Sequence, residues 1–172
     1  MSELRTNRII PRDGLTSGTG IGGGIIQIKQ SIKKDTFTTA NNTSNYTDIT
    51  GLSVAITPTR SDSKILVKAV IYNSNNNAVN FFRLLRGSTF IEQPSGTSSS
   101  GAVYNAHAFA YYNADNWQDS TTIEILDSPA TTSATTYKIQ CAVTGGTCTI
   151  NKFHGTSNYY GISTITAMEV SG

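Results

Sequence analysis

"KILVKAVIY", residues 64–72, is the stretch of sequence that decides the fold. Every second residue along it is apolar, so Ile65, Val67, Ala69 and Ile71 fall on one face of an extended chain, and the opposite face carries both apolar and polar residues. The β-branched side chains of Ile and Val favour this extended backbone. The run then ends in "NSNNN", residues 73–77, which is typical of a loop. We therefore predict a core strand over residues 64–72.

Further segments of strand length and strand composition follow the same pattern, and clusters of Asn, Gly, Ser and Pro separate them. No helical periodicity persists for three turns. A Gly87-Ser88 turn after residues 79–86 predicts a hairpin that returns through Phe90 and Ile91. We expect an all-β head, an antiparallel β-sandwich or jelly roll whose edges are covered by polar loops or neighbouring subunits. The other expected strands lie within residues 25–32, 52–56, 102–112, 122–126, 136–143, 147–153 and 161–170.

The stretch "SGTGIGGGIIQIKQ", residues 17–30, contains the spacing G-x-G-x-x-G in Gly18, Gly20 and Gly23. This spacing binds a dinucleotide only where a strand precedes it and a helix begins directly after it. Here Pro11 interrupts the segment before the glycines, and the segment after them alternates as a strand does. We interpret the glycines as a hinge between an extended N-terminal arm, residues 1–24, and a head domain, residues 25–172.

The chain is weakly basic, and its charge is unevenly distributed. The net charge of the 172 residues is +2, and only 14% of them are charged. Residues 1–34 hold six basic and two acidic side chains, 6 − 2 = +4, which leaves −2 for the remainder. Such a low charge density favours protein contacts over nucleic-acid binding.

The arm carries three arginines around a short apolar pair. No aromatic side chain accompanies them for base stacking, so we expect the arm to dock onto an acidic protein surface. The chain start lacks the pattern of a signal peptide, and no apolar run is long enough to span a membrane, so we expect synthesis in the cytosol without membrane insertion. The predicted docking residues are Arg5, Arg8, Ile9, Ile10 and Arg12.

The two cysteines, Cys141 and Cys148, flank a Gly145-Gly146 pair. If the glycines form a two-residue hairpin turn, Val143 pairs with Cys148, and both sulfur atoms lie on one face of the hairpin. A disulfide and two small buried side chains are both compatible with this register. Because we expect a cytosolic origin, we favour the two buried side chains.

No catalytic or metal-binding set is recognisable in the sequence. His107 and His154 are the only histidines, and no metal-ligand spacing connects them to further ligands. We expect a protein that is not an enzyme and that holds no metal and no cofactor.

The single tryptophan, Trp117, lies in the densest acidic stretch, between Asp115 and Asp119. Carboxylates beside an aromatic ring are typical of glycosidase clefts, whereas a solvated loop with Trp117 over the end of the core needs no chemistry. We favour the solvated loop over catalysis. We expect sugar contact without catalysis through Asp115, Asp119 and the rings of Trp117, Tyr159 and Tyr160, which stack on sugar. The expected contact loops are residues 93–101, 113–120 and 154–160, and Tyr104, Tyr111 and Tyr112 are further expected exposed or rim aromatics.

Several segments resemble small virion structural proteins of tailed bacteriophages, most closely those of phages that infect marine bacteria and cyanobacteria. They are "SELRTNRIIPRDG" (2–14), "GGGIIQIKQ" (22–30), "ITGLSVAITPTRSDSKILVKAVI" (49–71), "RLLRGST" (83–89), "LDSPATTSATTYKIQ" (126–140) and "STITAMEV" (163–170). The resemblance covers most of the chain and is weak over residues 93–120. It implies an N-terminal segment that attaches to the particle and a β-rich head that projects as part of a fibre or spike, commonly as a trimer.

Three classes of function follow from these observations. The first is a trimeric tail-fibre, head-fibre or spike component that binds host surface polysaccharide; the second is a capsid decoration or joint protein that only stabilises the particle. The third is a glycan-degrading enzyme, which usually needs a long solenoid or a cleft with paired acids. We favour the first, with the virion as its location and other virion proteins, such as portal, adaptor, tail or capsid proteins, as partners of the arm.

Overall fold

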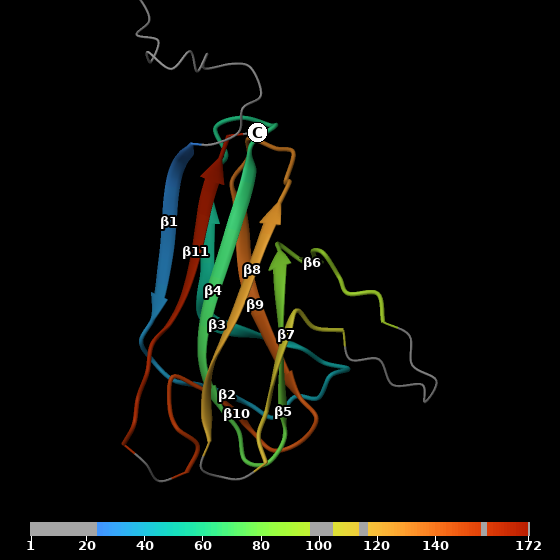
Figure 1. Cartoon of the computed structure of the whole chain (residues 1–172), viewed down its shortest axis with the longest axis vertical. Helices are drawn as coiled ribbons and strands as arrows, with labels where there is room; N and C mark the ends of the chain where they lie inside the picture. The colour runs from blue at the N-terminus through green and yellow to red at the C-terminus, as the bar shows by residue number, and fades with distance from the viewer. Residues whose placement is uncertain (1–23, 97–104, 114–116, 156–157, 172) are drawn as a thin grey trace, which may run out of the picture.

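The computed structural model describes residues 24–96, 105–113, 117–155 and 158–171, and these residues form an all-β protein without a helix (Figure 1). Every pairing between its strands is antiparallel, as the sequence predicted. The strands are β1 (Ile25–Lys33), β2 (Phe37–Thr39), β3 (Thr47–Ile56), β4 (Lys64–Ser74), β5 (Val79–Arg86), β6 (Thr89–Phe90), β7 (Ala108–Tyr111), β8 (Gln118–Asp127), β9 (Thr135–Val143), β10 (Cys148–Ile150) and β11 (Ser163–Val170).

Strand β4 is the centre of a six-stranded sheet. It pairs with β8 along one edge and with β11 and β10 along the other, and β1 and β2 lie beyond β11 and β10. Among the described residues, β1 pairs with β11 alone and β8 pairs with β4 alone, so these two strands form opposite edges of the sheet.

The five-stranded sheet has β9 and β5 at its centre. Strand β3 pairs with β9, and the other edge of β5 pairs with both β6 and β7. The predicted hairpin is confirmed, because Leu85 pairs with Phe90 and Arg86 with Thr89. Gly87 has a φ of 58° in this turn, a backbone conformation that favours glycine.

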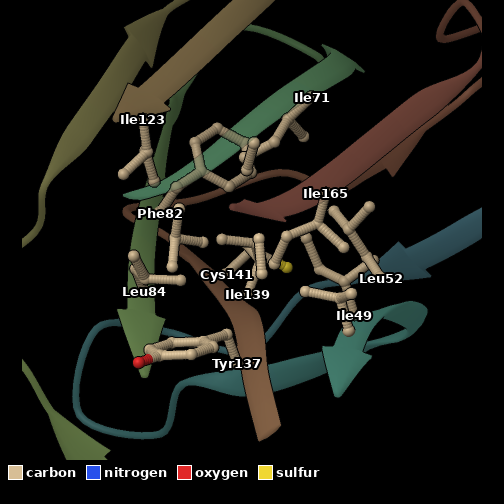
Figure 2. Packing of buried hydrophobic residues seen from close by; sticks show 14 of the residues in the cluster. Ile49, Leu52, Ile71, Phe82, Leu84, Ile123, Tyr137, Ile139, Cys141 and Ile165 are labelled. Atoms are coloured by element: carbon tan, nitrogen blue, oxygen red, sulfur yellow. The ribbon is translucent and has the colours of Figure 1, made fainter. Parts of the chain in front are cut away.

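One hydrophobic core contains side chains from both sheets (Figure 2). The four side chains predicted for the core face of β4 are fully buried, and they share this cluster with Leu84 of β5 and Ile139 of β9. Burial of a side chain of this size stabilises a fold by about 1.5–3 kcal/mol, so the alternation in "KILVKAVIY" is sufficient to fix which face of β4 points inward.

The conditional hairpin between residues 143 and 148 does not form. Strand β9 lies in the five-stranded sheet, whereas β10 pairs with β2 and β4 in the six-stranded sheet, so the Gly145-Gly146 turn connects the two sheets. A Cβ atom at Gly146 would lie 2.3 Å from Asn76 Oδ1, which excludes a larger residue at this crossing. Cys141 and Cys148 are free and buried, and the expectation of two small buried side chains is confirmed.

Residues 1–23 of the predicted arm, which include the docking residues Arg5, Arg8, Ile9, Ile10 and Arg12, lie outside the described residues. In the described part of the chain, no helix has the length and apolar character needed to cross a membrane.

Candidate functional site

The six-stranded sheet has two distinct ends. At the proximal end, Lys64 pairs with Val170, and the backbone N–H of Ser171 donates to the carbonyl oxygen of Gly24 at 3.2 Å. At the distal end, Ser74 pairs with Gln118. The eleven residues of β4 separate these ends by roughly 33 Å, given the usual rise of a strand. The chain therefore enters the described structure at one end and presents the start of β8 at the other (Figure 1).

Trp117 lies at the distal end, directly before β8, and its side chain is 64% exposed. The next residue, Gln118, accepts a hydrogen bond from the hydroxyl of Tyr72 at the end of β4. Burial raises the pKa of Tyr72, so its phenol stays a neutral donor over the physiological range. The predicted exposure of Trp117 is confirmed, and Trp117 is not a core residue.

Tyr159 and Tyr160 are 68% and 61% exposed in the connection between β10 and β11. Tyr160 forms an isolated antiparallel bridge with Lys152, and the Lys152 ammonium lies 5.9 Å from its ring centroid. The ring of Tyr159 packs edge-on against Phe153, at 6.2 Å between centroids, and Phe153 N donates to Tyr159 O at 3.0 Å. Two short backbone segments thus hold both rings outward.

Tyr72 connects the two aromatic groups. A Cβ atom at Gly161 would lie 2.5 to 2.8 Å from three atoms of the Tyr72 ring, so only glycine fits beside that ring. Gly161 follows Tyr160, and Gln118 follows Trp117. Tyr72 therefore contacts the backbone next to one exposed ring and the side chain next to the other, which places Trp117 and Tyr160 at the same end of the sheet.

Asn151 fixes the start of the β10–β11 connection. This buried residue has a φ of 61°, and its Nδ2 donates to the carbonyl oxygens of Lys33 and Asp35 at 2.8 and 3.0 Å. Its Oδ1 accepts from the hydroxyl of Ser163 at 2.6 Å. Asparagine tolerates the left-handed backbone conformation better than most residues and satisfies its polar atoms here.

A buried amide network supports the distal end from inside. Asn73 Nδ2 donates to Thr121 Oγ1 at 2.9 Å, and Asn80 Nδ2 donates to Asn73 Oδ1 at 2.9 Å. The Tyr112 hydroxyl donates to Asn73 Oδ1 at 2.6 Å. Tyr112 was expected among the exposed aromatics, and this expectation is wrong: it is buried because its hydroxyl finds an acceptor there, whereas its neighbour Tyr111 is exposed.

The remaining predicted contact residues are distributed differently. Asp119 is exposed in β8, and its Oδ1 accepts from the backbone N–H of Ser120 at 2.7 Å. Asp115 and Tyr104 lie outside the described residues. Residues 93–96, the described part of the first expected contact loop, follow β6, which pairs with Leu85 and Arg86 at the proximal side of β5. The structure does not bring this part of the loop to Trp117 and Tyr160.

His107 has a structural role. Its Nδ1 accepts from the backbone N–H of Leu84 at 2.8 Å, and its Nε2 lies 2.8 Å from the carbonyl oxygen of Ile91, which fits a neutral ring with the proton on Nε2. Within the described ranges, no group of three His, Cys, Asp or Glu side chains could hold a metal ion.

The distal end thus combines exposed aromatic rings, backbone amides and one ammonium group. Such a surface can stack on the apolar face of a sugar and bond to its hydroxyl groups. The sequence indicated the exposed rings but not the role of Tyr72 between them. The alternation of Tyr72 with Ile71 predicts only that Tyr72 lies on the outer face of a strand. No protein-family model matches the chain, and no curated protein matches it significantly.

Proposed function

We propose that this protein is a virion structural component of a tailed bacteriophage, a homotrimeric fibre or spike head without enzymatic activity. The observation that carries the proposal is the separation of the two ends of the six-stranded sheet. Residues 24 and 171 meet at the proximal end, and Trp117 and Tyr160 are exposed at the distal end. An N-terminal arm at the proximal end would attach to other virion proteins while the distal end points away from the particle.

We further infer that the head is a jelly roll. Its pairings are nested: β1 with β11, β3 with β9, β4 with β8, and β5 with β7. The resulting strand orders, β1-β11-β4-β8 and β3-β9-β5-β7, are those of two four-stranded sheets wound from one folded ribbon, with β2, β6 and β10 as short extensions. Jelly-roll heads of this kind serve in capsid and lectin domains.

The proposed ligand of the distal end is host surface polysaccharide. Trp117, Tyr159 and Tyr160 supply exposed rings, and Lys152 supplies a cation beside one of them. Tyr159 and Tyr160 project from a connection that Asn151 and Gly161 hold in place, which favours binding because these two rings need little rearrangement. Asp119 is already engaged with Ser120, which favours contact over acid catalysis at this position.

A capsid decoration or joint protein is the second candidate, because a decoration protein needs a broad flat contact surface. The outer face of the six-stranded sheet offers one, with exposed Ile28 and Leu126 on its two edge strands. A stabilising protein would bury this face against the capsid and would have no use for the distal rings.

Labelling of purified phage particles with an antibody against this chain, viewed by electron microscopy, tests the proposal. Label at the outer ends of fibres or spikes supports a host-binding head. Even label over the capsid surface supports the decoration protein instead. Particles without label, from a lysate that contains the chain, would refute both.

A further inference from the structure

One edge of the six-stranded sheet is unusually apolar. Strand β1 exposes Ile25, Ile26, Ile28 and Ile32, and Ile28 is 57% exposed. Its outer edge pairs with no strand among the described residues. Natural proteins usually protect such an edge with charges, proline or a bulge, because a long apolar edge strand associates with other chains. Strand β1 shows one register shift, between Ile25 and Gln27, and the rest of the edge is regular.

The opposite edge carries a matching apolar side chain at the same level. Pairing across the sheet runs from Ile28 through Met168 and Leu66 to Leu126, and Leu126 is 48% exposed on β8. Directly paired residues point to the same face of a sheet, so this row is an apolar band across the outer face. Its two ends lie at the two free edges.

The two edges also carry opposite charges. Strand β1 contains Lys29 and Lys33 and no acidic residue, and β8 contains three acidic residues and no basic residue. Buried Lys33 forms an ion pair with Asp35, and buried Asp127 forms one with Arg86, within the chain. Lys29 therefore remains exposed on one edge, and Glu124 remains on the other in a half-exposed pair with Lys68 at 3.3 Å. A pair so exposed contributes little and leaves Glu124 available for a second cation.

The register places Lys29 and Glu124 in neighbouring rows on opposite faces of the sheet, because the row of Lys29 runs through Ala167 and Val67 to Ile125. Gln30, next to Lys29, lies in the row that ends at Glu124, just as Ile28 lies in the row that ends at Leu126. Rotation about an axis parallel to the strands keeps each residue at the same height along that axis. It therefore brings Ile28 of one copy to Leu126 of the next, and Gln30 to Glu124. A second copy of this chain therefore places apolar side chain against apolar side chain and the basic β1 edge beside the acidic β8 edge.

We propose that β1 of one copy meets β8 of the next copy, so that three six-stranded sheets close a ring around an axis parallel to their strands. This inference rests on the proposed homotrimer and identifies its contact surface. The contact is head-to-tail and uses two different patches, which closes into a ring when the rotation is 120°. All three N-terminal arms then leave at one end, and all three distal aromatic sites lie at the other.

Light scattering of the full chain after size exclusion measures the assembly. The wild type is expected at three times 18.4 kDa. Ile28→Glu and Leu126→Glu should each give the monomer mass, because each places a carboxylate in the apolar contact. Phe109→Glu is the matched control: Phe109 is exposed on β7 of the other sheet, so this variant should stay trimeric. Circular dichroism verifies that each variant is folded. If one of the two edge variants does not fold, the variant on the opposite edge still tests the contact.

A charge exchange gives an independent test. Gln30→Glu should raise the dissociation concentration roughly fivefold, because it places a carboxylate opposite Glu124, and the double variant with Glu124→Lys should restore it. A wild-type trimer that Ile28→Glu and Leu126→Glu leave intact would overturn this contact while the homotrimer stands. A wild type that is monomeric at every concentration would overturn both the contact and the homotrimer.

Discussion

Tyr137 and Asp127 join the two sheets through a buried hydrogen bond. The hydroxyl of Tyr137, on β9 of the five-stranded sheet, donates to Asp127 Oδ2, on β8 of the six-stranded sheet, at 2.6 Å. Nη1 of Arg86 lies 2.8 Å from each oxygen of the same carboxylate. Burial raises the pKa of Tyr137, and the Asp127 carboxylate raises it further, so the phenol remains a donor at all physiological pH values.

Tyr137→Phe should lower the free energy of unfolding by about 1–3 kcal/mol, because it leaves a buried carboxylate with one donor fewer. Chemical denaturation at pH 7 measures this difference. Thr136→Ala, at the exposed neighbouring position, is the control and should change stability by less than about 0.5 kcal/mol. Equal stability of Tyr137→Phe and the wild type would mean that this link does not hold the sheets together.

Glu169 predicts a loss of stability in acid. Burial raises the pKa of Glu169, but hydrogen bonds from Gln27 and Thr59 outweigh burial and lower the pKa from 4.5 to about 2. A lowered pKa stabilises the fold above pH 4.5, and this contribution is lost as the pH falls from 4.5 towards 2. Glu169→Gln should therefore be less stable than the wild type at pH 7 by about 1–3 kcal/mol, and the difference should shrink below pH 4.5. Glu92→Gln is the control for an exposed carboxylate.

His107 predicts a second pH dependence near neutrality. Burial lowers the pKa of His107 below 6.5, because it disfavours the charged ring. Protonation of Nδ1 would also remove the hydrogen bond that it accepts from the backbone N–H of Leu84. The unfolded chain then binds the proton first, so the stabilising contribution is complete above pH 6.5 and declines as the pH falls below it. The melting temperature should drop between pH 7.5 and 5.5 in the wild type and in His154→Gln. His107→Gln should lose this component; an unchanged profile would assign it to other groups.

Gly161→Ala tests the support of the distal site. The added methyl group would overlap the Tyr72 ring, so we expect a loss of about 1–3 kcal/mol together with displacement of Tyr72 or Tyr160. Gly145→Ala is the matched control, because its Cβ would meet only Ala78, at 3.8 Å. Thermal unfolding compares the two variants. If both variants are equally stable, the Tyr72 ring can move away from the added methyl group. Tyr72 would then not fix the positions of the two aromatic groups.

The strands with strong alternation were predictable from the sequence, and the crossings between sheets were not. Strands β1, β4, β9 and β11 lie close to their expected ranges, because one face of each contributes to the core or to a paired neighbour. Strand β7 is shorter than residues 102–112, and β2 was missed, because three residues carry no recognisable period. The Gly145-Gly146 turn has the composition of a hairpin, and only the pairing of β10 with β2 and β4 reveals the crossing.

The candidate site was predictable in part for a related reason. Polar loop composition indicated that Trp117, Tyr159 and Tyr160 are exposed, since nothing in those segments alternates. The composition did not predict the burial of Tyr112, because that burial depends on Asn73, which lies 39 residues earlier on another strand. Contacts between residues so far apart in sequence leave no local pattern.

Deletion of residues 1–23 should leave a folded head that no longer joins phage particles, because this segment contains too few apolar groups to fold alone. The deletion keeps Gly24, whose carbonyl oxygen accepts from Ser171. Circular dichroism and cosedimentation with particles measure the two properties. A truncated chain that is unfolded would place the arm within the fold, and one that still joins particles would assign attachment to the head.

Binding of the full chain to intact cells of the phage's bacterial host, before and after periodate oxidation of surface polysaccharide, tests host recognition by the distal end most directly. Wild-type chain should bind, and periodate treatment should abolish binding. The double variant Trp117→Ala/Tyr160→Ala should bind at least roughly tenfold more weakly with unchanged mass and melting temperature, given that stacking on a ring is commonly worth about 1 kcal/mol or more. Equal binding by a well-folded double variant, or no binding of the wild type to any host cell, would contradict the account.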